Sequence, residues 1–333
     1  MPNIINITKE SGIPLLGLAF IGIIARNNNN IIQIRTTTLC NQSCIFCSTD
    51  AGPFTKFHRT QYTVDVNYML EYLKEISNYF NQNLSVHIDS VGEPLMYPQL
   101  IYLIKEIKQI KNFKEISIVT NGTLLTSKKV KELEKAGLDR INLSVHSLNA
   151  LKSQQLFGTN TYNINKIIEI AKEIKKTRID LYLAAVYMPN INEQDIEDII
   201  KLAKEIDCKV VIQKYETHKY GRKVKTKEQT YYQFYRYLEN LEKKYYIKLK
   251  YNYSDLKAVK VNPLPIKFKK SEKVSVEIKA PGWFQNQVIA VARNRALTIM
   301  NCNEKIGKTI KARIIDNKDN IYLAEPLKQK IRI

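Results

Sequence analysis

Short apolar runs alternate along most of the chain with longer stretches of helical periodicity, and this order limits the possible folds more than any other feature. Strands are predicted over 31–36, 84–90, 115–120, 140–145, 179–187 and 209–215. Amphipathic helices are predicted over 68–81, 99–109, 127–136, 162–175, 193–206 and 227–245. Such alternation favours a parallel sheet. The sequence therefore predicts an α/β fold, a partial (β/α)6 TIM-like barrel with a lateral opening and its active site at the carboxyl ends of the strands.

The N-terminal region holds one long apolar run, 13–25, which is shorter than the roughly 18 to 20 residues that cross a bilayer. It also lacks the features of a signal peptide. We expect it to form a buried strand that pairs through a turn at 27–30 with the strand at 31–35. Residues 1–30 are thus predicted as an N-terminal strand and hairpin, with no membrane partner and a cytoplasmic location.

The C-terminal region changes character after a connection rich in Pro and Lys, at 262–270. Short apolar runs at 274–278, 287–292, 296–300, 309–315 and 321–324 are separated by turn residues. We therefore predict that 31–250 form the partial barrel, 251–271 a linker and 272–333 a small all-β barrel.

Positive charge is concentrated in the C-terminal part of the chain. Residues 209–333 hold 29 basic and 11 acidic side chains, a net charge of +18, out of +20 for all 333 residues. A solvated lysine-rich surface remains one interpretation. Because acids do not match these lysines, the imbalance also favours a polyanionic partner.

Three cysteines, Cys40, Cys44 and Cys47, follow the first predicted barrel strand within eight residues. Their thiolates can converge on an iron–sulfur cube and leave its fourth iron without a protein ligand. A structural zinc ion would need a fourth ligand, which His58 would have to supply. A disulfide is disfavoured because the chain has an odd number of cysteines, five in all.

The CxxxCxxC spacing, with Phe46 before the third cysteine, resembles the radical S-adenosylmethionine (radical SAM) superfamily. The likeness extends over about 31–215, and the string 35–53 is similar to a little-described archaeal-type branch of Fe-S oxidoreductases. Three further segments resemble family motifs in order, at 90–94 (SVGEP), 119–125 (VTNGTLL) and 142–148 (NLSVHSL).

This resemblance implies one [4Fe-4S] cluster held by the three cysteines, and S-adenosylmethionine as the second cofactor. An electron delivered through the cluster would break the S–C5′ bond and release a 5′-deoxyadenosyl radical. The resemblance implies cofactor contacts from Phe46, Gly92, Glu93, Thr120, Asn121 and Ser144. Thr120 and Asn121 are equally compatible with a simple turn.

Substrate contacts are predicted on the loop after the sixth strand, at Lys214, Tyr215 and Glu216, with His218 and Arg222 beyond them. On the fourth strand His146 is a further candidate, although a buried core histidine is the alternative. Charged loop residues are also often only solvated, so both interpretations remain open.

Residues 272–326 resemble a TRAM domain, a small RNA-binding β-barrel of several tRNA-modifying enzymes. Basic and aromatic side chains together suit phosphate contact and base stacking. The RNA-binding candidates are Trp283, Phe284, Arg293, Arg295, Lys308 and Lys311. A barrel that only shields the main domain is the alternative.

These features predict a radical SAM enzyme that modifies a nucleoside in RNA, with tRNA as the leading class. Its expected partners are RNA and an electron donor such as ferredoxin or flavodoxin. The alternatives are a radical enzyme acting on a peptide, protein or small-molecule precursor, and a non-catalytic nucleic-acid-binding metalloprotein. Only Cys208 and Cys302 remain outside the motif, which disfavours a second cluster.

Overall fold

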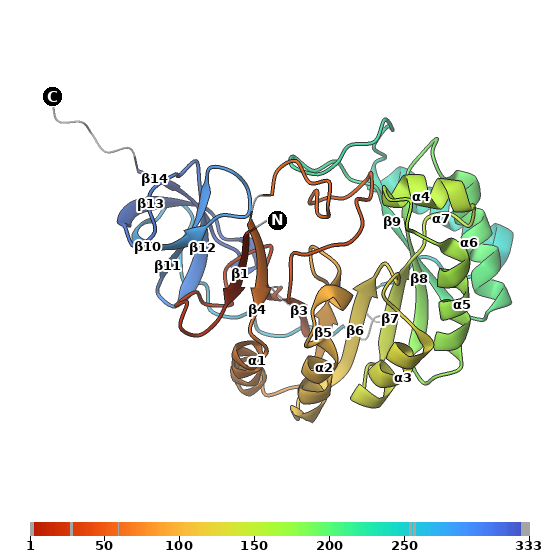
Figure 1. Cartoon of the computed structure of the whole chain (residues 1–333), viewed down its shortest axis with the longest axis horizontal. Coiled ribbons are helices and arrows are strands. Elements are labelled where there is room, and N and C mark those ends of the chain that lie inside the picture. The colour runs from red at the N-terminus through yellow and green to blue at the C-terminus, as the bar shows by residue number, and fades with distance from the viewer. Residues whose placement is uncertain (1–2, 27–28, 59, 253–254, 256–257, 328–333) are drawn as a thin grey trace.

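The structure is a computed structural model that describes residues 3–26, 29–58, 60–252, 255 and 258–327. Its main part is a seven-stranded sheet flanked by helices (Figure 1). In spatial order the strands are β2 (Gly22–Ala25), β3 (Ile31–Arg35), β5 (Leu84–Ile88), β6 (Phe113–Thr120), β7 (Arg140–Ser144), β8 (Asp180–Tyr187) and β9 (Lys209–Lys214). All neighbours are parallel except β2 and β3. The six predicted parallel strands are therefore confirmed.

The helices lie along the outside of this curved sheet (Figure 1). They are α1 (Val66–Phe80), α2 (Leu100–Gln109), α3 (Ser127–Ala136), α4 (Ala150–Phe157), α5 (Ile164–Lys175), α6 (Glu193–Glu205) and α7 (Tyr231–Tyr245), with short 3-10 turns at Pro94–Met96 and Lys318–Asn320. Helix α4 was not predicted. The side chains of Thr126 and Asn149 cap α3 and α4, and Gly137 ends α3 in a left-handed conformation.

The N-terminal apolar run differs from the prediction, because only Gly22–Ala25 forms a strand. The preceding residues are buried without regular pairing and join the main part of the molecule to the small barrel. Leu16 accepts a backbone hydrogen bond from Ala296, and Gly17 accepts one from Tyr322. A Cβ on Gly17 would lie 2.0 Å from the Ala296 oxygen, so this contact requires glycine. The expected turn at 27–30 lies partly outside the described residues.

A second, two-stranded parallel sheet was not anticipated. It joins β1 (Asn3–Ile7) to β4 (Thr60–Val64). Strand β4 follows the cysteine-bearing loop, and Thr38 donates a backbone hydrogen bond to Tyr62. The start and the end of that loop are thereby held together beside the main sheet.

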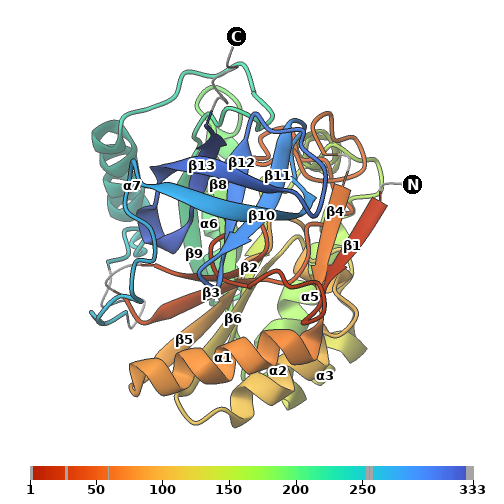
Figure 2. The same cartoon turned by 90° about the vertical axis from the view of Figure 1, so that its left-hand side faces the viewer.

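The small all-β barrel is confirmed as a closed five-stranded barrel (Figure 2). Its order is β10 (Lys273–Pro281), β11 (Gln287–Ala292), β12 (Arg295–Met300), β14 (Leu323–Pro326) and β13 (Thr309–Asp316). Phe268 packs in the barrel core and Leu264 in the core of the main part. The segment expected as a linker is therefore packed against both cores.

Aromatic side chains fix the barrel to the main part of the molecule. Trp283 is 3% exposed and stacks between Phe20, with ring centroids 5.3 Å apart, and His58, at 3.9 Å. The hydroxyl of Tyr62 donates a hydrogen bond to the Pro281 carbonyl. Aromatic burial of this kind contributes strongly to stability. The barrel is consequently part of one packed structure.

Candidate active site

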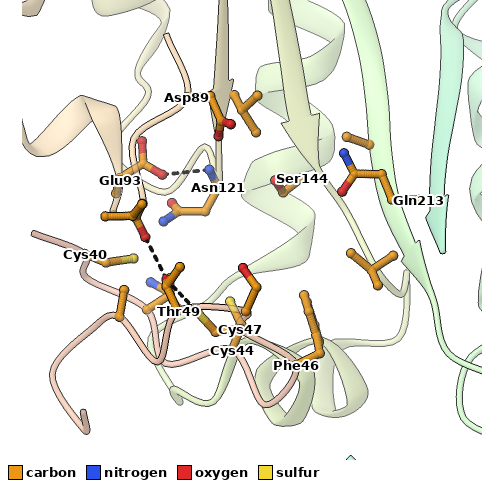
Figure 3. A pocket seen from close by; sticks show the side chains of 18 of the residues that line it. Cys40, Cys44, Phe46, Cys47, Thr49, Asp89, Glu93, Asn121, Ser144 and Gln213 are labelled. Carbon is orange, nitrogen blue, oxygen red and sulfur yellow. Dashed lines mark hydrogen bonds between the residues drawn. The ribbon is translucent and has the colours of Figure 1, made fainter. Parts of the chain in front are cut away.

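A cavity of about 410 Å³ lies at the carboxyl ends of the parallel strands, where the sequence places the active site. Figure 3 shows the cysteine loop on one side of this cavity and strand-end side chains on the other. The cavity brings together the predicted residues Cys40, Cys44, Cys47, Phe46, Gly92, Glu93, Thr120, Asn121, Ser144, His146, Lys214, Tyr215 and Glu216.

The three cysteine thiols share this cavity although none forms a disulfide. Burial raises the pKa of Cys40 to about 12 and that of Cys44 well above its usual value. A thiol must lose its proton to bind iron. A bound metal centre would compensate the negative charge of these buried thiolates and so stabilise them.

Neighbouring segments hold the cysteine loop in a fixed conformation. Arg222 places Nε 2.8 Å from Asp50 Oδ1, and its guanidinium also donates to the carbonyls of Cys44 and Ala51. The Arg222 N–H donates to the Cys47 carbonyl at 2.8 Å. Arg222 was considered as a substrate contact, but these bonds make it a clamp on the cysteine loop.

Gly92 lies against the start of the same loop. A Cβ at this position would lie 2.0 Å from the Leu39 oxygen and 2.6 Å from the Thr38 oxygen. The adjacent Glu93 N–H donates to Leu39 at 2.7 Å. Gly92 thus allows its own segment to approach the backbone of the cysteine loop closely. The SVGEP motif alone does not predict this packing role.

Glu93 has a buried carboxylate that links two strand ends. It accepts hydrogen bonds from the Thr120 hydroxyl at 2.7 Å, the Asn121 N–H at 2.8 Å and the Leu95 N–H at 3.0 Å. Burial raises the pKa of Glu93, and these three hydrogen bonds oppose that shift. Glu93 thereby positions the predicted residues Thr120 and Asn121, and the bond to Asn121 is visible in Figure 3.

His146 is a buried, neutral side chain at the cavity wall. Its Nδ1 accepts the N–H of Val186 at 3.1 Å, and its ring packs edge-on against Phe46 with centroids 4.5 Å apart. Burial lowers the pKa of His146 to about 3. These contacts agree with the alternative of a buried core histidine, and His146 also lines the cavity.

The candidates at the end of β9 and directly after it lie at the rim of the cavity. Lys214 Nζ lies 3.1 Å from Glu228 and 3.4 Å from Glu216, and the Glu216 carboxylate accepts the Tyr231 hydroxyl at 2.7 Å. Tyr215 is buried and its hydroxyl accepts the Val224 N–H. These side chains form a connected polar edge, so Lys214 and Glu216 are not simply solvated loop residues.

Arg35 and Asp89 are among the cavity side chains that sequence reasoning missed. Asp89 accepts a 2.5 Å hydrogen bond from Gln33, and the Arg35 guanidinium donates to the Ala19 carbonyl while its Nε has no partner. Period-two alternation points both side chains to the inside of the sheet. This alternation could have placed both residues in the cavity. It was overlooked because charged residues are expected at the surface.

His58 does not approach the cysteines as a zinc ligand would. Its Nδ1 lies 3.2 Å from the Trp283 carbonyl oxygen and its Nε2 lies 2.5 Å from that of Thr49. In the part of the chain that the structure describes, no group of three or more His, Cys, Asp or Glu side chains could hold a single metal ion. Through these two contacts His58 connects the cysteine loop to the barrel.

Two of the RNA-binding candidates are corrected by burial. Trp283 is enclosed between other rings, and Arg295 is 7% exposed, so neither side chain can reach a base or a phosphate. Phe284 is partly buried and stacks on Tyr220. Arg293 and Lys308 are paired with Glu272 and Glu304 on the surface. Lys311 is exposed on β13.

Comparison with protein families decides the chemistry of this site. Residues 34–203 match the model of the Radical SAM superfamily, which covers the cysteine loop and most of the parallel sheet. The chain belongs to the radical SAM superfamily. It is a radical SAM enzyme, with a [4Fe-4S] cluster and S-adenosylmethionine as its cofactors.

The donor set of the enzyme fits this pair of cofactors. Cys40, Cys44 and Cys47 line one cavity and would hold three irons of the cluster. The cluster supplies the electron that cleaves S-adenosylmethionine into a radical. Among the chain's own groups, Phe46 and the strand ends around Glu93 enclose the space beside the thiols.

Related sequences span the chain to different extents. The protein MJ0103 of Methanocaldococcus jannaschii, described as uncharacterized, is 37% identical over 94% of this chain and 78% of its own length. A GTP 3′,8-cyclase of Alkaliphilus oremlandii is 32% identical over 55% of this chain. This chain matches only about half, 55%, of the cyclase.

Solved structures share the fold at low sequence identity. Streptococcus suis SuiB has a TM-score of 0.53 at 19% identity, over 73% of this chain and 51% of SuiB. A radical SAM methyltransferase from Sphaerobacter thermophilus has a TM-score of 0.52 at 15% identity, over 66% of this chain and 65% of its own. In the described residues, no helix is both long and apolar enough to span a bilayer.

Proposed function

We propose that this radical SAM enzyme modifies a nucleoside in RNA, with tRNA as the class to test first. The observation that carries the proposal is a basic strip on the exposed face of β10 and β13, formed by Lys273, Lys311 and Arg313. In Figure 2 these strands face the viewer. A regular row of cations suits the phosphates of a nucleic acid.

The register of the two strands places like charges next to one another in this strip. Lys273 lies directly opposite Arg313, and Lys311 is the next residue but one on the same face of β13. Like charges directly across a ladder are destabilising. Glu325 binds Arg313 at 2.6 Å and offsets part of this repulsion. Phosphate groups would supply the remaining negative charge.

The place of the barrel supports the same proposal. Trp283 stacks on His58, which directly follows the cysteine loop, so the strip is held at a fixed distance from the cavity. RNA bound to the barrel would therefore present the same nucleotide to the site each time. We retain the TRAM-like identity of the barrel, with 272–333 as the RNA-binding part, within this proposal.

The lining of the cavity also supports a nucleoside substrate, because it contains polar groups that can hydrogen-bond to the edge of a base. Asp89 and Gln213 are polar side chains of the lining, and Lys214 lies at its rim. Base edges are recognised by such donors and acceptors. The GTP 3′,8-cyclases, which match the radical SAM part of this chain, bear the name of a nucleotide substrate.

The proposal is tested by mass spectrometry of tRNA nucleosides from cells with and without the gene. We expect one modified nucleoside to disappear without the gene and to return with the wild-type chain. The Cys44→Ala variant should not restore it. An unchanged nucleoside profile would contradict the RNA proposal and favour a peptide or small-molecule substrate.

A binding experiment examines the strip itself. Lys273→Glu together with Lys311→Glu should weaken tRNA binding at least about tenfold at low salt, because each phosphate contact contributes to a salt-dependent affinity. Lys105→Glu, an exposed position on α2, is the matched control. Deleting the barrel would be uninformative, since Trp283 and Leu264 pack in the main core.

A further inference from the structure

A second basic and aromatic surface lies on the loops around the cysteine motif. Phe54 is 67% exposed and Phe57 is 38% exposed, which is unusual for phenylalanine. Lys56, Lys219 and Lys223 are exposed beside them. We call Phe54, Lys56, Phe57, Lys219, Tyr220 and Lys223 the outer face.

One direct contact joins the two loops of the outer face, and a second lies within one of these loops. The rings of Phe57 and Tyr220 meet edge-on with centroids 5.8 Å apart. Lys219 Nζ lies 5.1 Å from the centroid of the Tyr220 ring. The contact between Phe57 and Tyr220 therefore brings side chains of the two loops together on the surface.

The outer face is built directly on the back of the cysteine loop. The Phe54 N–H donates to Ser43 Oγ at 3.2 Å, and the Lys56 N–H donates to Asp50 Oδ2 at 2.7 Å. Arg222, next to Lys223, donates its N–H to the Cys47 carbonyl. Short, rigid connections thus run from the surface to the residues that hold the cluster.

The outer face is separate from the lining of the cavity. The cavity is lined by the thiols, and none of the six outer-face residues contributes to its lining. A substrate must reach the cavity, because the radical forms there. The outer face is therefore suited to a partner that needs to come close to the cluster without entering the cavity.

Charge indicates the kind of partner. The segments 51–58 and 217–227 contain six basic residues and no acidic residue. One of the six, Arg222, is neutralised by Asp50, which leaves Lys56, Lys219, Lys223, Lys225 and Lys227. A positive field of this density attracts and orients an acidic protein. Exposed aromatic side chains such as Phe54 and Phe57 are typical of an interface core.

We propose that the outer face docks an acidic electron-carrier protein that reduces the cluster. The carrier is oxidised by one electron, and the cluster held by Cys40, Cys44 and Cys47 is reduced by that electron. No proton, atom or group moves in this step. Because electron transfer weakens steeply with distance, contact at the back of the cysteine loop is favourable. The inference is independent of which substrate enters the cavity.

The test compares two reductants on the reconstituted full-length enzyme under anaerobic conditions. The triple variant Lys56→Glu, Lys219→Glu and Lys223→Glu is reduced either by an acidic flavodoxin or by dithionite, and the reduced cluster is followed by EPR. We expect the rate with flavodoxin to fall at least about tenfold at low salt, as for other steered encounters. The rate with dithionite should remain at the wild-type value.

Controls and a binding measurement complete the experiment. Phe54→Ala should weaken the affinity for oxidised flavodoxin, measured by calorimetry, because it removes an exposed anchor. Two control variants on α2 make the same kinds of change far from the outer face. Lys105→Glu reverses a surface charge and Tyr102→Ala removes an exposed aromatic side chain, and neither should change the reduction rate or the affinity for flavodoxin. High salt should abolish the difference between the triple variant and the wild type.

Three outcomes would overturn the proposal. Equal rates with flavodoxin for variant and wild type would show that the carrier docks elsewhere. A matching loss with dithionite would show damage to the cluster site. Weakened tRNA binding with an unchanged flavodoxin rate would assign the outer face to the substrate. The nucleoside profile tests the RNA proposal separately.

Discussion

The Arg222 guanidinium binds the Asp50 carboxylate at 2.8 Å, although the two residues are 172 positions apart in the chain. Asp50 is 2% exposed and closes the loop that carries the three cysteines. Arg222 follows the last strand of the sheet, so this pair joins the two ends of the partial barrel. The cysteine loop is thereby fixed from both sides.

Replacing Arg222 by Ala should release this loop. Removing one partner of a buried ion pair costs about 3–5 kcal/mol, because the other charge is left uncompensated. We expect a lower thermal midpoint and less iron and sulfide per chain after anaerobic reconstitution. The exposed neighbour Lys223→Ala is the control and should retain full iron content. Normal iron content in Arg222→Ala would contradict the clamp.

Glu93→Gln tests the link between β5 and β6. The amide nitrogen of Gln would face a group that already donates, either Thr120, Asn121 or Leu95. An unsatisfied buried donor costs about 1–3 kcal/mol, which denaturant unfolding would measure. On the surface, Glu132→Gln loses only the pair with Lys128 and should cost about 0.5 kcal/mol or less. Equal effects of both changes would contradict the role of Glu93.

The surroundings of His146 predict a pH dependence of stability. Its pKa is about 3 in the folded chain and about 6.5 when unfolded, so the unfolded state binds more protons between these values. Stability from this residue is complete above pH 6.5 and is lost as the pH falls toward 3. Between pH 7 and 5 the wild type should lose about 2 kcal/mol more than His146→Gln. Parallel pH curves of unfolding free energy would contradict a neutral buried His146.

Trp283 is the only tryptophan of the chain and reports on the contact between the barrel and the main part. Because it packs on Phe20 and His58, its fluorescence transition in urea should coincide with the loss of helical circular dichroism. Trp283→Ala should destabilise by about 3–5 kcal/mol, and Tyr232→Ala, at a 74% exposed position, by much less. Two separate transitions would indicate an independent barrel.

Local patterns predicted the sheet because its strands are apolar on the side that packs against the helices. Ile116 and Ile118 in β6 are fully buried, and such runs are recognisable without any knowledge of the fold. Helix α4 was missed because it has only eight residues and four of them are polar, Lys152, Ser153, Gln154 and Gln155. Its existence depends on the Asn149 cap and on packing.

The site was predictable only where a motif or a strand end placed it. The cysteines and Glu93 belong to such segments, and the structure brings them to one cavity. Arg222 looked like an ordinary basic loop residue because its partner lies on a distant loop. Trp283 was predicted as an RNA contact because aromatic side chains stack on bases, but Phe20 and His58 bury it. Long-range packing of this kind leaves no local pattern.

The most direct test of the account is the cleavage of S-adenosylmethionine by the reconstituted enzyme. Under anaerobic, reducing conditions the wild type should release 5′-deoxyadenosine, measured by chromatography, and unmodified tRNA should increase the amount. Cys44→Ala, which removes one thiol of the cavity, should release none. Absence of 5′-deoxyadenosine from the wild type, or equal amounts from Cys44→Ala, would contradict the assignment of these three cysteines.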